Sequence, residues 1–156
     1  FEDHFSKEEL ERHFDFYEPF TVHESSLSPC VHSIQAAKLG RMEQAYTFYL
    51  RTSRLDLDDY NKEVEEGLHI TSMAGTWMSI VEGFGGMRIV DGTLSFEPQI
   101  PEQWNSFAFK INFRDQIITM KASAKTTTFE ITGSEALDIL VNGKSITLEP
   151  GKEVAA

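Results

Sequence analysis

The spacing of apolar residues divides the chain into a helical first part and a β-rich second part. Up to about Phe84, apolar residues recur every three or four positions, which is the period of an α-helix. From Met87 onward, β-branched residues, phenylalanines and turn dipeptides take over, as is typical of short strands. The sequence therefore predicts an α+β fold in two parts, residues 1–86 and residues 87–156.

Local signals set the ends of the first helices. The stretch "SKEE" at residues 6–9 predicts a capping box, in which the serine and the second glutamate satisfy backbone groups at a helix start. In residues 28–40, Ser28 is expected to cap a second helix, Pro29 fits its first turn and Gly40 fits a left-handed stop.

Two further helical stripes follow. One buried face is predicted from Met42, Ala45, Tyr46, Tyr49 and Leu50. The other stripe consists of Ile70, Met73, Ala74, Trp77, Val81 and Phe84. The glycines of "GFGG" at residues 83–86 are expected to end that helix, because glycine is a poor helix former.

Three dipeptides predict hairpins in the second part. Asp91-Gly92, Arg114-Asp115 and Asn142-Gly143 each lie between two runs of strand character. Parallel strands need long crossover connections, and none is present between these runs. An antiparallel sheet or sandwich is therefore expected for residues 87–156.

Composition narrows the function classes. The 156 residues carry a formal net charge of −11, which argues against general binding to nucleic acid or to an anionic membrane. No run approaches the roughly 20 apolar residues of a membrane span. One cysteine excludes an internal disulfide and favours a reducing, cytoplasmic location. The apolar helices and the absence of an initial methionine are expected for part of a longer protein.

Two predicted helix starts carry polar side chains that suit an anion. A helix amino terminus offers unpaired N–H groups and about half a positive charge, and so it binds phosphate without basic residues. Ser25 and Ser26 precede one start and His69 precedes another. If the two starts converged, they could enclose a tetrahedral anion. The alternative is that the serines are only caps and turn residues, and His69 only a hydrogen-bonded histidine.

Other candidate sites have weaker support. His23, His32 and His69 with Glu24 do not have the spacing of a known metal motif, so no metal site is predicted. The acidic stretch at residues 54–67 has enough carboxylates for acid and base work, but a solvated loop is the simpler interpretation. Cys30 is expected to be a buried small side chain.

Four segments together resemble glycoside hydrolase family 65. They are "YEPFTVHESSLSPCVHSIQAAKLG", "FYLRTSRLDLDDYN", "GLHITSMAGTWMSIVEGFGGMRI" and "LSFEPQIPEQWNSFAFKI", which run in order from about Tyr17 to Phe113. The resemblance implies the last helices of an (α/α)6 barrel followed by a carboxy-terminal β-domain. Beyond Phe113 only the strand pattern agrees.

The resemblance also implies a reaction. In this family phosphate attacks the anomeric carbon of an α-glucoside with inversion, while a glutamic acid protonates the leaving oxygen. Phosphate sits near the segments that match Ser25, Ser26 and His69, and we expect His23 and Glu24 to support them, with Glu24 turned away from the anion. No metal or organic cofactor is implied, since phosphate is a substrate.

The resemblance leaves the catalytic acid outside the chain. The motifs of the general acid and of the main glucose-binding residues are absent from the 156 residues, so no catalytic residue is assigned here. The expected partners are an α-glucosyl disaccharide, inorganic phosphate, the amino-terminal part of the same polypeptide and a second copy in a homodimer. Maltose is the favoured substrate over trehalose and kojibiose.

Two other functions stay open beside the phosphorylase that the family resemblance implies, and neither is catalytic. One is a self-contained, β-rich carbohydrate-binding module in which Trp77 and Trp104 stack on sugars. In that reading the helices are only a leader. The other is a structural interaction domain whose helical face contacts a partner. Trp77 lies in a helical apolar stripe, and Trp104 is expected to anchor packing between strands.

Overall fold

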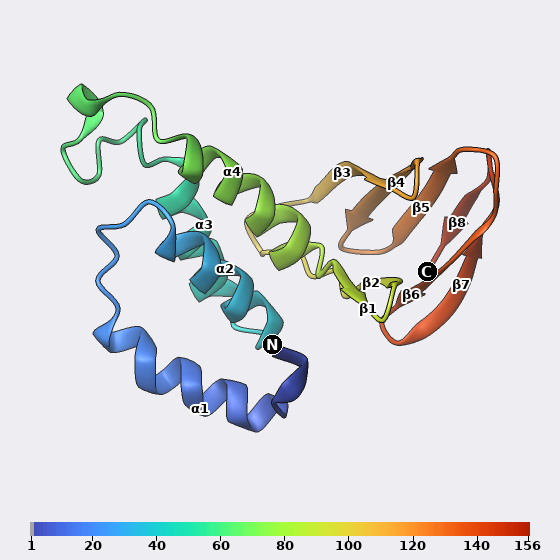
Figure 1. Cartoon of the computed structure of the whole chain (residues 1–156), viewed down its shortest axis with the longest axis horizontal. Coiled ribbons are helices and arrows are strands. Elements are labelled where there is room, and N and C mark those ends of the chain that lie inside the picture. Colours follow the sequence, from blue (N-terminus) through green and yellow to red (C-terminus); the bar gives the residue numbers. More distant parts are fainter. Residues whose placement is uncertain (1) are drawn as a thin grey trace. The chain divides into compact units, whose positions relative to one another are not determined.

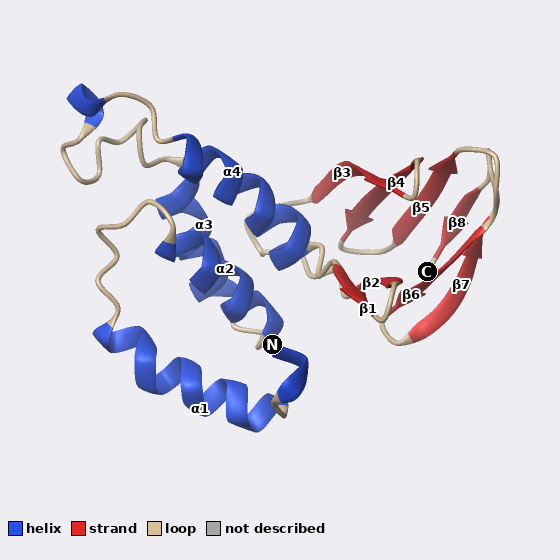
Figure 2. Cartoon of the chain, viewed as in Figure 1, coloured by secondary structure: helices blue, strands red, loops and turns tan. Residues whose placement is uncertain are grey.

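The computed structural model describes residues 2–156, which fall into two compact units. One unit runs up to Gly83 and the other from Phe84 to Ala156. Helices make up the first unit and strands dominate the second (Figures 1 and 2). The fold is therefore α+β, as the residue pattern predicts.

The described part of the first unit contains four α-helices. They are α1 (Lys7–Tyr17), α2 (Ser28–Lys38), α3 (Met42–Ser53) and α4 (Ile70–Met78). Single 3-10 turns occupy Glu2–His4, Glu18–Phe20 and Val64–Glu66. Between α3 and α4 the chain forms a long loop, which closes back on the start of α4.

The predicted capping signals hold for α1 but not for α2. Ser6 and Glu9 form the expected capping box at the start of α1. Ser28, however, is the first helical residue of α2 and does not cap it; the cap position belongs to Leu27. The Ser28 hydroxyl is instead 3.1 Å from Nδ1 of His23. Gly40 adopts the left-handed conformation predicted for a helix stop, with φ +78°.

Packing selects different faces of α3 and α4 than the apolar stripes suggest. Of the five residues predicted to be buried on α3, only Ala45 is fully buried. The helix buries Ala45, Phe48 and Thr52 instead. On α4 the buried positions are Ser72 and Gly75, because small residues allow close helix packing.

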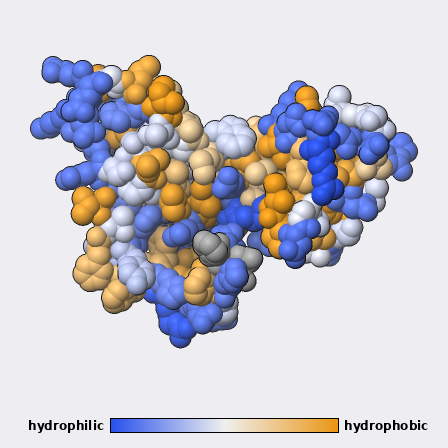
Figure 3. Space-filling view, viewed as in Figure 1, coloured by the Kyte–Doolittle hydropathy of each residue, from blue (hydrophilic) through white to orange (hydrophobic). Residues whose placement is uncertain are grey.

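The apolar stripe of α4 is largely exposed. Ile70, Met73 and Trp77 are 66%, 48% and 48% exposed. Hydrophobic residues are visible on the surface of the helical unit (Figure 3). A π-helical turn, Ser79–Phe84, continues the helix through Gly83, and the helix then ends within "GFGG", as predicted. No helix among the described residues is long and apolar enough to cross a bilayer.

The second unit contains two four-stranded sheets. One has the order β1-β2-β6-β7 and the other β3-β4-β5-β8. The strands are β1 (Arg88–Val90), β2 (Thr93–Phe96), β3 (Ser106–Phe113), β4 (Gln116–Ser123), β5 (Thr127–Thr132), β6 (Leu137–Val141), β7 (Lys144–Leu148) and β8 (Glu153–Ala155). All neighbours pair antiparallel except β2 and β6, which are parallel.

The three predicted hairpins are confirmed. β1 pairs with β2, β3 with β4 and β6 with β7, and both residues of each connecting dipeptide have positive φ. That conformation matches the right-handed twist of the strands. The rings of Phe96 on β2 and Phe129 on β5 lie 5.1 Å apart, so the two sheets share one core.

Candidate phosphate site

The starts of α2 and α4 meet at Ser26. Its hydroxyl lies 2.7 Å from the hydroxyl of Thr71 in the first turn of α4. The Ser72 hydroxyl donates to the backbone carbonyl of Ser26 over 3.1 Å. Although 45 residues separate Ser26 from Thr71, the two polar helix starts are therefore adjacent.

Neither helix start is closed by a side chain. The residue at the cap position of α2 is Leu27 and that of α4 is His69, and neither makes a side-chain capping bond. Ser25 is exposed, and its hydroxyl accepts a hydrogen bond from the Leu27 backbone N–H over 3.2 Å. The loop before α2 is thus held in a turn. In the first turn of α4, the Ile70 N–H donates to the Leu68 carbonyl over 3.1 Å and the Ser72 N–H to the His69 carbonyl over 3.0 Å, so only part of the helix start is open to another acceptor.

His69 is held by two carboxylates from the loop before α4. Asp56 accepts from the His69 backbone N–H over 2.9 Å and pairs with Nδ1 of its ring over 2.5 Å. Glu63 lies 3.5 Å from Nε2 on the other side of the ring. The imidazole is half-buried, with 21% of its side chain exposed.

These carboxylates favour the charged form of His69. The hydrogen bond to Asp56 raises the pKa of His69 above its ordinary value, and the negative charges of Asp56, Glu63 and Glu66 act in the same direction, against partial desolvation. The same backbone and side-chain hydrogen bonds lower the pKa of Asp56. Both ring nitrogens of His69 face carboxylates, so a positive charge on the imidazole is paired with Asp56 and Glu63.

Two further residues, Arg51 and Asn61, hold the loop before α2 at residues 21–27, which we call the serine loop, and no motif in the sequence marks them. Arg51 donates to the backbone carbonyl of His23 over 2.5 Å, and its guanidinium lies over the Tyr60 ring at 5.4 Å. Asn61 donates to the backbone carbonyl of Glu24 over 2.8 Å. Sequence spacing gives no signal for these bonds, because they join residues 28 and 37 positions apart, on either side of α2.

The supporting residues His23 and Glu24 differ in their surroundings. The His23 ring is enclosed by aromatic side chains, with ring centroids 4.7 Å from His32 and 4.9 Å from Phe48. Glu24 is exposed, and its backbone carbonyl is bonded to Asn61 as described. His23 therefore supports the loop from within the core, whereas Glu24 lies at its surface.

The carboxylates of the acidic stretch and the three histidines fall into separate groups. Asp56 and Glu63 face His69, and Asp58 pairs with Arg54 over 2.6 Å, so these carboxylates are partners of nearby cations. Among the described residues, the metal-compatible group contains His23 and His32 with Glu18; His69 and Glu24 are not in it.

Cys30 is buried, as predicted. Only 3% of the residue is exposed, and burial raises the pKa of its thiol. The thiolate is therefore disfavoured, which fits a packing residue.

Two family models match the chain, one for each part. The model of the glycosyl hydrolase family 65 central catalytic domain matches residues 1–78, and the model of the family 65 C-terminal domain matches residues 87–148. The chain belongs to glycosyl hydrolase family 65. The two matches agree with a helical segment of the catalytic domain followed by a β-domain.

Similar family 65 proteins differ in their named substrates. The chain is 50% identical over 149 residues to a maltose phosphorylase of Bacillus subtilis (strain 168), with 96% of this chain covered. It is 43% identical to an alpha,alpha-trehalose phosphorylase of Thermoanaerobacter brockii, with 95% covered. A kojibiose phosphorylase of Halothermothrix orenii is 30% identical, with 96% covered.

A solved structure has the same fold over the length of this chain. The structure titled "Putative kojibiose phosphorylase from human microbiome" superposes with a TM-score of 0.91 and 40% identity, covering 99% of this chain and 23% of that one. This chain also covers only 20%, 19% and 20% of the three curated relatives. It thus spans about a fifth of their length.

Proposed function

We propose that this chain is the carboxy-terminal part of an inverting disaccharide phosphorylase, in which Ser25, Ser26 and His69 bind the attacking phosphate. The supporting relatives are phosphorylases of maltose, trehalose and kojibiose. The observation that carries the proposal is the meeting of the two polar helix starts, with 2.7 Å between the hydroxyls of Ser26 and Thr71. Hydroxyls, backbone N–H groups and an imidazolium are the donors that a tetrahedral anion requires.

The proposed reaction needs positioning of phosphate rather than its activation. A phosphate oxygen attacks the anomeric carbon from the face opposite the leaving group, and the glycosidic C–O bond breaks. The leaving oxygen takes a proton from an upstream glutamic acid, giving β-glucose 1-phosphate and a free sugar. Because phosphate is already an anion, donors that orient it take the place of a base that would activate water.

In this proposal the phosphate-binding residues lie in this chain, and the catalytic acid lies in the amino-terminal part of the full-length polypeptide. The isolated chain is therefore expected to form no glucose 1-phosphate from disaccharide and phosphate. Anion-exchange chromatography of the reaction mixture measures this product directly. Its formation by the purified 156-residue chain would show that the acid lies within it.

Maltose is the proposed disaccharide, because the chain is 50% identical to the maltose phosphorylase but 43% and 30% identical to the trehalose and kojibiose phosphorylases. No organic cofactor is proposed for the reaction. A homodimer remains an expectation from the family resemblance.

The carbohydrate-binding module is not favoured. Trp104 is half-buried, and its ring packs 5.0 Å from Phe84 and 5.9 Å from Phe107. This packing supports the predicted structural role of Trp104. Trp77 is exposed, but it lies on α4 beside Ile70 and Met73, not on a strand of the β-unit.

Product analysis of the full-length polypeptide tests the proposed function. The protein is incubated with maltose, trehalose or kojibiose, with and without inorganic phosphate, and the products are followed by ¹H and ³¹P NMR. The expected result is β-glucose 1-phosphate, formed only with phosphate and fastest from maltose. Free glucose alone, released at the same rate without phosphate, would indicate a hydrolase and overturn the proposal.

A further inference from the structure

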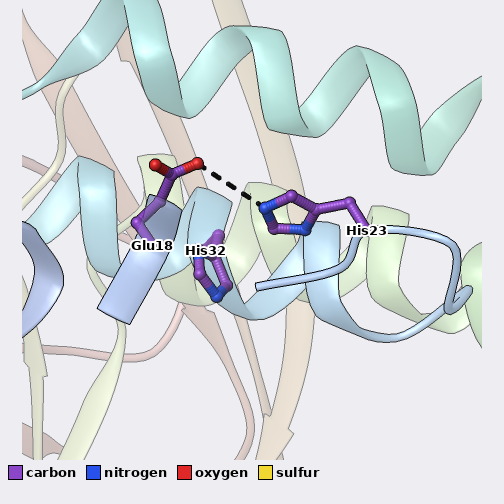
Figure 4. A group of neighbouring side chains, drawn as sticks. All are labelled: Glu18, His23 and His32. Carbon is purple, nitrogen blue, oxygen red and sulfur yellow. Dashed lines mark ion pairs between the residues drawn. The ribbon is translucent and has the colours of Figure 1, made fainter. Parts of the chain in front are cut away.

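Three side chains with metal-binding atoms gather beside the serine loop. Glu18 lies on the 3-10 turn after α1, His23 in the following loop and His32 on α2 (Figure 4). One potential ligand atom from each lies within 4.8 Å of the others. Glu18 Oε1 and His23 Nε2 are 3.6 Å apart.

One ring nitrogen of each histidine makes no hydrogen bond to the described residues. His23 Nε2 and His32 Nδ1 are buried and make no hydrogen bond. Burying a polar atom without a partner is costly, so each such atom calls for an explanation. A bound cation would supply the missing interaction for both.

The second nitrogen of His23 is arranged as it is in metal-binding histidines. His23 Nδ1 lies 3.1 Å from the Ser28 hydroxyl. A histidine that binds a metal through one nitrogen usually donates its other N–H to a neighbouring acceptor, which fixes the tautomer and orients the ring. With Ser28 as that acceptor, the Nε2 lone pair points away from Ser28 and is free to bind an ion.

The cluster lies beside a cavity and close to two basic side chains. Arg51 donates to the backbone carbonyl of His23, and Lys38, which pairs with Glu2 over 3.0 Å, lines the same cavity as Glu18 and His32. The side chain of Glu18 is 26% exposed, and Glu18 and His32 both line a cavity of about 360 Å³. An ion therefore has a route of entry.

We infer that Glu18, His23 and His32 form a binding site for a divalent transition-metal ion such as zinc. Two imidazoles and one carboxylate are a ligand set that zinc accepts in tetrahedral geometry, leaving a fourth position for water or another ligand. Bonds of about 2.0–2.1 Å place two ligands about 3.4 Å apart. The Glu18–His23 spacing already matches this value, and the rest of the cluster closes with shifts of about 1.4 Å or less.

The ion would brace the first unit rather than take part in phosphorolysis. Its three ligands come from the turn after α1, the serine loop and α2, which makes it a cross-link between segments. The inference stands apart from the proposed function, since it concerns binding of an ion and not the reaction.

Metal titration of the full-length polypeptide tests the site. The metal-free protein is titrated with Zn²⁺ by calorimetry and with Co²⁺ by visible absorption, which reports tetrahedral coordination. The protein is expected to bind one equivalent at this site. Glu18→Gln and His32→Gln should abolish that equivalent, and Ser28→Ala should weaken its affinity about tenfold to a hundredfold. The matched control His13→Ala removes an exposed imidazole that lines the same cavity and should retain it.

Two results would overturn the inference. One is the absence of Zn²⁺ binding by the wild-type protein, and the other is unchanged binding in both Glu18→Gln and His32→Gln. X-ray absorption of the zinc-loaded wild-type protein covers the case in which a variant does not fold. A zinc shell with two imidazoles and a carboxylate is expected, and a shell without two imidazoles would contradict the assignment. None of these measurements depends on phosphorolysis.

Discussion

At the scale of single residues, the pairing of His69 with Asp56 sets the charge at the start of α4. The raised pKa of His69 means that its favourable contribution is complete below the ordinary histidine pKa of about 6.5 and is lost as pH rises through the raised value. The lowered pKa of Asp56 means that its contribution is complete above about 3.8 and is lost as pH falls through the lowered value. The pair is therefore strongest between about pH 4 and 6.5.

Replacing Asp56 tests this pairing. In Asp56→Asn the pKa of His69 is expected to fall toward its ordinary value, because the hydrogen bond to a carboxylate is its largest cause. An NMR titration of full-length protein labelled with ¹³C in its histidines measures the shift. His13, exposed on α1, is the internal control and should titrate unchanged. An unaltered pKa of His69 in the variant would show that Asp56 does not set its charge.

The same residues show the limit of sequence reasoning about the site. Ser26 and His69 could be singled out because each precedes a helix, and helix starts have recognisable local signals. Asp56 and Asn61 could not, because they lie in an irregular loop without periodicity, and their partners are His69 at the start of α4 and Glu24 in the loop before α2. A serine before proline fits a cap position, but Ser28 lies inside α2 and its hydroxyl pairs with His23 instead.

At the scale of elements, the hairpins were predictable and the sheet order was not. Each hairpin depends on two adjacent residues that adopt positive φ, and this preference is local. The parallel pairing of β2 with β6 joins residues more than 40 positions apart, so no dipeptide marks it. The π-helical turn through Gly83 shows likewise that packing can override a low helix propensity.

Two glycines of the β-unit allow steric contact to be separated from backbone strain. Gly86 and Gly143 both have left-handed φ, +61° and +76°. A Cβ on Gly86 would lie 2.5 Å from the backbone carbonyl oxygen of Glu97, whereas a Cβ on Gly143 would have no neighbour within 4 Å. Alanine at either position carries the left-handed cost of about 1–2 kcal/mol. Only alanine at Gly86 would also push the backbone of Glu97 away.

Gly86→Ala is therefore expected to destabilise the protein more than Gly143→Ala. The additional loss should be about 1–3 kcal/mol, the range for overpacking a close contact. Urea denaturation of the two variants, made in the same full-length polypeptide, measures the difference. Equal free energies of unfolding would mean that the approach of Gly86 to Glu97 is not maintained in solution.

At the scale of the whole molecule, the exposed stripe of α4 fits a segment of a larger protein. Ile70, Met73 and Trp77 leave apolar surface uncovered on one helix, and the chain spans about a fifth of the length of its relatives. Contiguous apolar surface of this kind marks an interaction site. In the proposed phosphorylase, the preceding helices of the catalytic domain cover it.

Serine substitutions at Ile70 and Met73 should act oppositely in two contexts. In the isolated chain, Ile70→Ser and Met73→Ser are expected to increase the soluble fraction, because they remove exposed apolar surface. In the full-length polypeptide the same changes should cost about 1.5–3 kcal/mol per side chain, because these groups are then buried. Ultracentrifugation and thermal unfolding measure the two effects. Unchanged stability of the full-length variants would show that no segment covers α4.

The central claim is that the joined helix starts bind the attacking phosphate. Its most direct test is the Michaelis constant for phosphate and for disaccharide in full-length Ser26→Ala and His69→Ala, with Thr47→Ala on α3 as a control for loss of an exposed hydroxyl. Loss of a hydrogen bond to a charged group costs about 1.5–3 kcal/mol, so the constant for phosphate should rise about tenfold to a hundredfold while that for disaccharide changes little. Equal increases in both constants would contradict the phosphate site.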